Sequence, residues 1–262
     1  MSSESAVLVT GASTGIGAVY AERFARRGHD LVLVARNHER LTALAERLRD
    51  ETGVQVDILQ ADLTQDSDIA AVEQRLREDA RIRILVNNAG TSIPGDFLHQ
   101  SSYDITRLIT LNVTSVARLA NAIAPRLGQA GEGAIVNIAS VVGLGPEMGL
   151  TVYGATKAFV LFLSQGLDVE LSAKGVYVQA VLPAATRTEI WQHSGKDVDT
   201  IPGVMEVDKL VDAALVGFDR RESVTIPPLH DETQWQTLNA TRQAMLPGFA
   251  QSEPAARYLL RS

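Results

Sequence analysis

Short runs of apolar, mostly β-branched residues alternate along the chain with longer segments of helical period. The runs expected to form strands are Ala6–Thr10, Leu31–Ala35, Val54–Leu59, Ile82–Val86, Ala134–Ile138, Val176–Leu182 and Ser223–Ile226. Helices are expected over Ala18–Arg27, Glu39–Arg49, Asp66–Glu78, Ser102–Leu127 and Val152–Ala173. This alternation is typical of a parallel sheet with helices on both faces. The pattern therefore predicts a doubly wound α/β fold.

Two segments depart from this rhythm, and neither contains a repeat or a linker, so we expect one domain over residues 1–262. Residues 187–204 are polar and loop-like, and we expect them to form a lid over a substrate. Residues 229–262 extend beyond the last strand and carry Trp235, Leu238, Met245 and Leu246 at roughly helical spacing. This spacing predicts a packed helix more often than a ligand site.

Composition narrows the range of functions. The 262 residues are 45% hydrophobic and carry a net charge of -7 without a long run of one sign, which argues against nucleic-acid or membrane-surface binding. There is no cysteine, and the five histidines are scattered, so we expect no disulfide and no metal site. No apolar run approaches the ~20 residues that span a bilayer. We expect a cytoplasmic protein.

Glycines cluster directly after the first expected strand, in Thr10-Gly-Ala-Ser-Thr-Gly-Ile-Gly17, where the next helix begins. Glycine lets the backbone turn sharply and approach a pyrophosphate at a helix N-terminus. A glycine cluster alone also fits a plain turn, but the order strand, glycines, helix favours a dinucleotide site. The absence of a following Gly-Lys-Ser/Thr excludes the Walker phosphate loop. The expected contacts here are Gly11, Ser13, Thr14, Gly15, Ile16 and Gly17.

The residue at the end of the second strand chooses between dinucleotides. An acid there accepts hydrogen bonds from a ribose 2′-hydroxyl, whereas an arginine pairs with a 2′-phosphate. This chain has Arg36 at that point, while Asp30 precedes the strand and so belongs to the opposite edge of the sheet. A surface arginine at a helix start is the alternative. We interpret Arg36 as favouring NADP(H).

Polar and small residues also follow the third and fourth strands, at the edge where open α/β sheets bind ligands. Asp62 can accept from an adenine amino group or serve as an acid at a helix start. Asn88 can equally bind a ligand or tie its loop to the sheet, and Gly90 permits close approach of the backbone. The expected cofactor contacts are Asp62, Leu63, Asn88, Ala89 and Gly90.

Tyr153 and Lys157 lie four residues apart in an expected helix, so a phenol and an ammonium project from one face. A nearby cation lowers a tyrosine pKa from its usual value near 10, which suits general acid work at neutral pH. Taken alone, the pair also fits a tyrosine packed on a lysine stem. Ser140 ends the fifth strand thirteen residues before Tyr153, so the two side chains can share one crevice.

In combination these motifs resemble the short-chain dehydrogenase/reductase family, over residues 6 to about 190. The resemblance is carried by the glycine loop, Asp62-Leu63, Asn87-Asn-Ala-Gly90, Asn112, Ser140, Tyr153 with Lys157, and Pro183. It implies a Rossmann-type single domain with a seven-stranded parallel sheet, NAD(P)(H) binding, and a homodimer or homotetramer built on two long helices.

The resemblance also implies roles for individual residues. Tyr153 donates a proton to the substrate carbonyl oxygen, Ser140 hydrogen-bonds that oxygen, and Lys157 lowers the tyrosine pKa and bonds the nicotinamide ribose. Asn112 marks a local helix distortion that holds a water in a proton relay. A solvated helix residue is the alternative for Asn112.

Two departures concern the substrate side. The chain has Pro183-Ala184 where the family usually has Pro-Gly, which reduces backbone freedom beside the nicotinamide, and its carboxamide is expected near Thr186 and Thr188. The loop between Ser140 and Tyr153 is largely apolar. We expect a mainly apolar substrate pocket, although each residue also fits core or surface: Ile93, Phe97, Glu147, Met148, Trp191 and His193.

The sequence thus predicts an NADPH-dependent carbonyl reductase, reversible as an alcohol dehydrogenase, with Tyr153 as acid and base. A ketoacyl thioester reductase is the nearest alternative, which the acidic net charge disfavours mildly because coenzyme A and carrier proteins present phosphates. A non-catalytic NADP(H) sensor is the alternative of another class. The complete set of catalytic residues weighs against a sensor, which needs only the glycine loop.

Overall fold

The computed structural model describes residues 5–189 and 197–259 of the chain. By their internal contacts these residues form two compact units, one ending at Pro227 and the other beginning at Pro228. Every strand of the sheet described below lies in the first unit.

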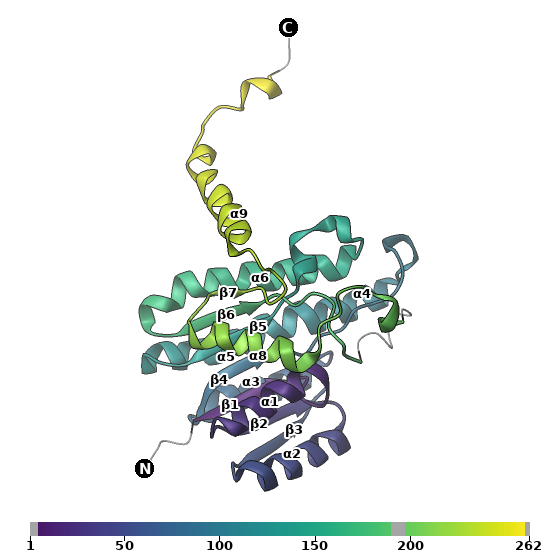
Figure 1. Cartoon of the computed structure of the whole chain (residues 1–262). Helices are drawn as coiled ribbons and strands as arrows, with labels where there is room; N and C mark the ends of the chain where they lie inside the picture. Colours follow the sequence, from purple (N-terminus) through teal and green to yellow (C-terminus); the bar gives the residue numbers. More distant parts are fainter. Residues whose placement is uncertain (1–4, 190–196, 260–262) are drawn as a thin grey trace. The chain divides into compact units, whose positions relative to one another are not determined.

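The first unit is built on a seven-stranded sheet in the order β3-β2-β1-β4-β5-β6-β7 (Figure 1). All neighbouring strands run parallel. The strands are β1 (Ala6–Thr10), β2 (Asp30–Ala35), β3 (Val56–Gln60), β4 (Ile82–Asn87), β5 (Ala134–Ile138), β6 (Tyr177–Val181) and β7 (Val224–Thr225). The predicted doubly wound α/β fold is confirmed, with strand bounds within two residues of those expected.

Helices cover the sheet on both faces, which explains why its strands are almost continuously apolar. On one face lie α1 (Gly15–Arg26), α2 (His38–Thr52) and α8 (Val207–Asp219), and their core includes the fully buried Tyr20 and Phe24. The core of the other face is formed with α3 (Asp66–Glu78), α5 (Ser115–Ala130) and α6 (Thr151–Leu171). β1, β5 and β6 are buried at every position because both faces are covered.

The structure differs from the expected elements in two places. The single helix expected over Ser102–Leu127 is divided into α4 (Ser102–Ile109), a π-helix at Thr110–Thr114, and α5. The helix α8 was not among the expected elements, although Leu210, Val211, Ala214 and Leu215 are buried on one side of it. Short 3-10 helices occupy Phe97–His99, Val141–Leu144, Pro146–Met148, Ser172–Lys174, Val198–Thr200, Leu246–Phe249 and Ala256–Tyr258.

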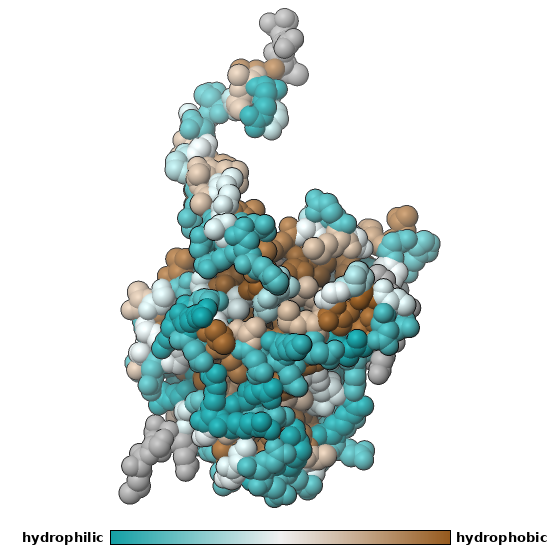
Figure 2. Space-filling view, in the orientation of Figure 1, coloured by the Kyte–Doolittle hydropathy of each residue, from teal (hydrophilic) through white to brown (hydrophobic). Residues whose placement is uncertain are grey.

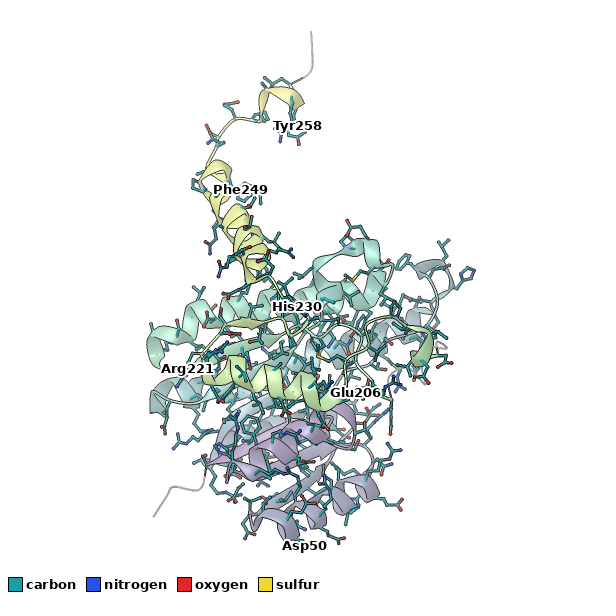
Figure 3. All side chains as sticks on the ribbon, viewed as in Figure 1. Asp50, Glu206, Arg221, His230, Phe249 and Tyr258 are labelled. Atoms are coloured by element: carbon teal, nitrogen blue, oxygen red, sulfur yellow. The ribbon has the colours of Figure 1, made fainter. Side chains whose placement is uncertain are left out.

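The second unit contains α9 (Glu232–Ala244), so the helical spacing of Trp235 and its neighbours did indicate a helix. The expectation that this helix is packed was wrong for the described residues, because no residue of α9 is buried. Phe249 and Tyr258, labelled in Figure 3, are exposed as well. A helix this short gains little stability from its own hydrogen bonds in water.

Candidate active site

The site lies at the carboxyl edge of the sheet, where β1 meets β4. β2 and β3 lie on one side of β1, whereas β4 and the later strands lie on its other side. The strand order therefore reverses between β1 and β4. Doubly wound sheets bind ligands at such a reversal. The glycine loop follows β1, Asn88 to Gly90 follow β4, and Ser140 follows β5. The topology therefore brings three of the predicted motifs to one edge.

The glycine loop requires its glycines for two physical reasons. Gly11 and Gly15 have φ angles of 65° and 54°, which side chains disfavour. A Cβ added at Gly17 would lie 2.4 Å from the Gly11 carbonyl oxygen. At the start of α1 the Thr14 side chain caps no amide and the first turn holds no acid. The N–H groups of this helix end therefore face a place that suits a phosphate.

Thr10 holds the glycine loop against the loop after β4. Its Oγ1 accepts hydrogen bonds from the Asn88 and Ala89 amides, both at 3.0 Å, and donates to the Val86 carbonyl at 3.3 Å. The Asn88 side chain donates to the carbonyls of Thr10 (2.9 Å) and Gly11 (3.3 Å). Asn88 was expected either to bind a ligand or to tie its loop to the sheet, and its side-chain nitrogen ties the loop to the chain after β1. Thr10 was not predicted, and only its place directly before the glycines pointed to it.

Asp62 lies at the end of β3 and is organised by Thr64. Its Oδ1 accepts from the Thr64 amide (3.0 Å) and hydroxyl (2.8 Å). Partial burial acts to raise the pKa of Asp62, but these hydrogen bonds and the charges of Arg36 and Arg107 hold the pKa below its usual value. Asp62 is therefore a carboxylate at neutral pH. Leu63 is buried in the core behind it.

Arg36 is exposed at the end of β2, and no carboxylate within residues 5–189 and 197–259 forms an ion pair with it. Asp30 begins the same strand and accepts from the Gln55 amide at 2.9 Å, so it lies at the opposite edge, as expected. Near the glycine loop, a hollow of about 410 Å³, the loop hollow, is lined by Ser13, Thr14, Arg40, Ala43, Leu44, Arg47 and Glu189. The sequence analysis missed Arg40 and Glu189.

Ser140, Tyr153 and Lys157 come together from the end of β5 and the first turns of α6. Ser140 acts on the Tyr153 phenol as the hydrogen-bonding group that lowers its pKa, and Ser140 Oγ donates to the Pro183 carbonyl at 3.1 Å. Lys157 Nζ lies 5.7 Å from the centre of the Tyr153 ring and donates to the Ile138 carbonyl at 2.8 Å. A phenol, a hydroxyl and an ammonium therefore share one crevice, as the spacing predicts.

The electrostatics of this group differ from the expectation. Burial raises the pKa of Tyr153 to about 12, and the hydrogen bond with Ser140 opposes this only in part. Burial also lowers the pKa of Lys157 to about 8. The expectation of a lowered Tyr153 pKa was wrong for the protein's own groups, because desolvation disfavours the charged forms of both residues and the net shift is upward.

Asn112 lies in the π-helix between α4 and α5 and is 1% exposed. Its side chain bonds both backbone groups of Thr91, with distances of 3.1 Å to the nitrogen and 2.9 Å to the oxygen, and donates to Thr156 Oγ1 at 3.1 Å. A Cβ at Gly90 would lie 3.3 Å from Asn112 Oδ1 and 3.5 Å from Lys157 Nζ. The predicted helix distortion is confirmed, and Gly90 lets the backbone after β4 lie close to both Asn112 and Lys157.

Comparison with known proteins agrees with this geometry. The family model described as short chain dehydrogenase matches residues 5–199. The chain belongs to the short-chain dehydrogenase family. The resemblance noted from the sequence motifs is confirmed, and the chain is an oxidoreductase of that family.

Several relatives of this dehydrogenase have solved structures. A short-chain dehydrogenase from Sphingobium yanoikuyae in complex with NADPH is 67% identical, with a TM-score of 0.96, over 97% of this chain and 100% of that one. The bulky-bulky ketone specific alcohol dehydrogenase from Comamonas testosteroni is 58% identical, with a TM-score of 0.92, over 98% of this chain and 99% of that one.

A curated relative points to another substrate. The very-long-chain 3-oxoacyl-CoA reductase-A of Danio rerio is 39% identical over 187 residues, which cover 70% of this dehydrogenase. The match spans only 58% of that relative's own length. This relative therefore supports the family, while its substrate belongs to a longer protein.

The segment after β6 lies against Ser140 and the glycine loop. The Pro183 carbonyl accepts from the Val141 amide at 3.0 Å in addition to Ser140, and Thr186 Oγ1 donates to the Ala184 carbonyl at 3.1 Å. A Cβ at Gly15 would lie 3.3 Å from Thr188 Cγ2, so Thr188 lies against the glycine loop. Ala184 has a negative φ and thus no strain in place of glycine. The structure brings this segment to the site as predicted.

The residues expected to line a substrate pocket lie in the segments that follow β4 and β5, apart from Trp191 and His193. Ile93 is half-buried, while Phe97, Glu147 and Met148 are exposed, Phe97 at 58% and Met148 at 55%. Figure 2 shows hydrophobic patches on the visible face of the molecule. Trp191 and His193 lie outside the described residues. The pocket assignment stays a prediction.

The described parts of the dehydrogenase contain neither a metal-ligand cluster nor a membrane-spanning helix. Residues 5–189 and 197–259 contain no group of three or more His, Asp or Glu side chains that could hold a metal ion. In the same residues, no helix combines the length and the apolar character that crossing a bilayer requires.

Proposed function

We propose that this enzyme reduces a ketone or aldehyde to an alcohol with NADPH, and that the reaction is reversible. The observation that carries the proposal is the convergence of Tyr153, Ser140 and Lys157 at the sheet edge where the glycine loop lies. A bound dinucleotide fits this edge, because the N–H groups at the α1 N-terminus have no side-chain cap and the glycines keep the loop packed closely on the Gly11 carbonyl and Asn88. When bound, NADPH supplies the hydride.

The chain's own residues handle the proton and the carbonyl oxygen. The Tyr153 hydroxyl, whose pKa burial raises to about 12, carries its proton at neutral pH and donates it to the developing alkoxide, which is a stronger base than the phenolate. The Ser140 hydroxyl, already in contact with Tyr153, supplies a second hydrogen bond to the same oxygen. In alcohol oxidation Tyr153 takes the proton back.

Lys157 and Asn112 support this proton transfer. The Lys157 ammonium lies against the tyrosine ring and stabilises negative charge on the phenol when the proton leaves. Asn112 keeps the π-helix and the Thr91 loop in register with α6 through Thr156. Its Oδ1 lies on the Lys157 side of the site, which supports a water-mediated relay between them.

We assign NADP(H) as the cofactor because Arg36 is unpaired within the described residues and follows β2, where the ribose is read. The end of β2 carries Arg36 and Asn37, and neither is the acid that would accept from a ribose 2′-hydroxyl. The Sphingobium yanoikuyae relative, 67% identical, was solved with NADPH, which supports the assignment. Arg36, the glycine loop and Asp62 would hold the adenosine half of the cofactor.

As the substrate we favour a ketone with two bulky apolar substituents. The Comamonas testosteroni relative is a bulky-bulky ketone specific alcohol dehydrogenase, and it matches this chain at 58% identity over almost its full length. Phe97 and Met148 are exposed apolar side chains in the segments after β4 and β5, which suits an apolar substrate. The alternative is a 3-oxoacyl thioester, which the Danio rerio relative at 39% identity supports more weakly.

The substrate assignment is tested by following NADPH absorbance with matched panels. Aryl alkyl ketones with two large substituents, small ketones, aldehydes and 3-oxoacyl-CoA esters of increasing length would be compared by kcat/KM. We expect the highest values with bulky ketones. Higher values with long 3-oxoacyl-CoA esters would support the alternative, and an absence of turnover on every panel would leave only the NADP(H) sensor.

We further propose that the enzyme acts in the cytoplasm as a homodimer or homotetramer. The oligomer is supported by α6, where Phe162 and Val169 are 76% and 80% exposed and leave an apolar face uncovered in the single chain. A chain without cysteine also suits a reducing compartment. Light scattering on the purified protein would measure the assembly, and a Phe162→Lys variant should reduce its mass.

A further inference from the structure

Arg40 lies in the first turn of α2, where a positive charge opposes the helix dipole. The Asn37 side chain caps this helix by accepting from the Arg40 amide at 2.9 Å, which fixes the start of α2. Arg36 precedes the cap, so two arginines and the positive end of a helix are gathered within five residues. Such a cluster is stabilised by an anion.

In this structure the anion is the carboxylate of Glu189, 149 residues further along the chain. Both of its oxygens accept from Arg40 Nη1, at 2.8 and 3.0 Å. Glu189 follows Thr188, which lies against Gly15 of the glycine loop. A negatively charged group with two acceptor oxygens is therefore already held beside the loop hollow.

The second arginine of the loop hollow is engaged differently. Arg47 pairs with Glu22 at 3.3 Å and with Glu51 at 3.2 Å, two acids of α1 and α2 that belong to the helical layer itself. Among the described residues Arg40 has Glu189 as its acidic partner, and both side chains are about half exposed. An exposed ion pair of this kind is weak and exchanges readily for a stronger anion.

We propose that Arg40 is a second cation for the 2′-phosphate of NADPH and that Glu189 competes with this phosphate for it. The inference rests on the proposed cofactor. Ser13 and Thr14 line the same loop hollow and supply hydroxyl donors for phosphate oxygens. A phosphate carries more charge than a carboxylate and displaces it from Arg40, whereas NADH leaves the Arg40–Glu189 pair intact. The pair thereby sets how strongly the site prefers NADPH to NADH.

The test measures dissociation constants of NADPH and NADH for the full-length protein and three variants. Arg40→Gln should weaken NADPH binding roughly tenfold, because a charged hydrogen bond to phosphate is lost, and should leave NADH binding nearly unchanged. Glu189→Gln should strengthen NADPH binding by about two- to fivefold, the range of an exposed ion pair, with no gain for NADH. In the double variant the gain from Glu189→Gln should vanish.

The exposed pair Arg27–Asp219, joined at 2.8 Å at the other end of α1, supplies the matched control. Arg27→Gln and Asp219→Asn should leave both dissociation constants unchanged. If Glu189→Gln leaves NADPH binding unchanged or weakens it, competition by Glu189 is refuted. If Arg40→Gln affects NADPH and NADH equally, Arg40 does not contact the 2′-phosphate. Failure of the unaltered protein to bind either dinucleotide would instead refute the proposed function.

Discussion

At the scale of single residues, the site is a set of groups whose protonation is governed by burial. Tyr153 and Lys157 are both withdrawn from water, so each is held nearer its neutral form than a free side chain. Ser140 is the hydrogen-bond partner that favours charge on the phenol. Arg36, in contrast, is exposed and keeps its charge free for a ligand.

The role of Tyr153 is tested by Tyr153→Phe, which removes the hydroxyl and keeps the ring. We expect kcat to fall by about 10²- to 10⁴-fold because the general acid is lost. NADPH affinity, measured by fluorescence titration, should change little. Tyr103→Phe alters an exposed tyrosine of α4 and should be silent, so equal effects of both changes would contradict the role of Tyr153.

Lys157 predicts a pH dependence of carbonyl reduction. Its pKa of about 8 means that the ammonium loses its proton as pH rises through 8, whereas Tyr153, with a pKa of about 12, remains protonated. The value of kcat/KM for reduction, which reports free-enzyme groups, should therefore decline above about pH 8. Lys157→Arg keeps its charge at every accessible pH and should flatten the profile. A profile of the unaltered enzyme that stays level to pH 10 would exclude this role.

Arg36 predicts the cofactor preference. Arg36→Asp should weaken NADPH binding relative to NADH by roughly 10- to 100-fold, because a charged hydrogen bond becomes a repulsion. The ratio of the two dissociation constants is the measurement. Arg220→Asp, at the exposed C-terminal end of α8, should leave the ratio unchanged. An unchanged ratio in Arg36→Asp would show that another residue reads the ribose.

At the scale of elements, turns and helix ends decide where these residues meet. The glycine loop can pack on the loop after β4 only because Gly11 and Gly17 lack side chains. The π-helix at Thr110–Thr114 turns Asn112 into the protein, where a regular helix would present a different side chain. β5 and α6 then bring Ser140 to Tyr153.

Gly17→Ala tests the close packing of the glycine loop. The new Cβ would lie 2.4 Å from the Gly11 carbonyl oxygen and 2.5 Å from Asn88 Nδ2, so the loop must move. We expect a loss of roughly 1–3 kcal/mol in the free energy of unfolding, measured by urea denaturation, together with weaker cofactor binding.

Gly128→Ala is the matched control in α5, where an added Cβ would meet only the flexible Lys174 side chain, at 3.4 Å. This change should raise the free energy of unfolding by up to about 1 kcal/mol, because alanine favours a helix over glycine. A Gly17→Ala variant as stable and as tightly binding as the unaltered protein would contradict the packing argument.

At the scale of the whole molecule, the fold and the candidate site belong to the first unit. Its seven strands and both core clusters end before Pro228, whereas no residue of α9 is buried in the second unit. The exposed apolar face of α6 belongs to the first unit as well.

Removal of residues 228–262 tests this division. The shortened chain should unfold in one cooperative thermal transition and bind NADPH with an affinity close to that of the full chain, because no core contact of the sheet is removed. Calorimetry measures the thermal transition, and titration measures the NADPH affinity. A chain that ends at Asp219 also loses β7 and should be unstable. Loss of the cooperative transition on removing residues 228–262 alone would show that the second unit stabilises the first.

The sequence by itself determined the doubly wound fold, because the alternation of apolar runs with segments of helical period can be read locally along the chain. It also predicted which residues would gather at the carboxyl edge, since parallel strands bring their ends together. The break in the helix at Asn112 was expected from the family resemblance, but α8 was missed. The extent to which residues 228–259 are buried was not accessible to a local pattern either.

Only the tertiary structure decided the properties that depend on distant groups. The pKa of Tyr153 rises because the fold removes the phenol from water, an effect that the spacing to Lys157 cannot reveal. The Asn88 side-chain amide bonds Gly11, which lies 77 positions earlier in the chain. Arg40 pairs with Glu189, which lies 149 positions later. Local sequence specifies which chemical groups are present, whereas burial and long-range contacts decide their charge and their partners.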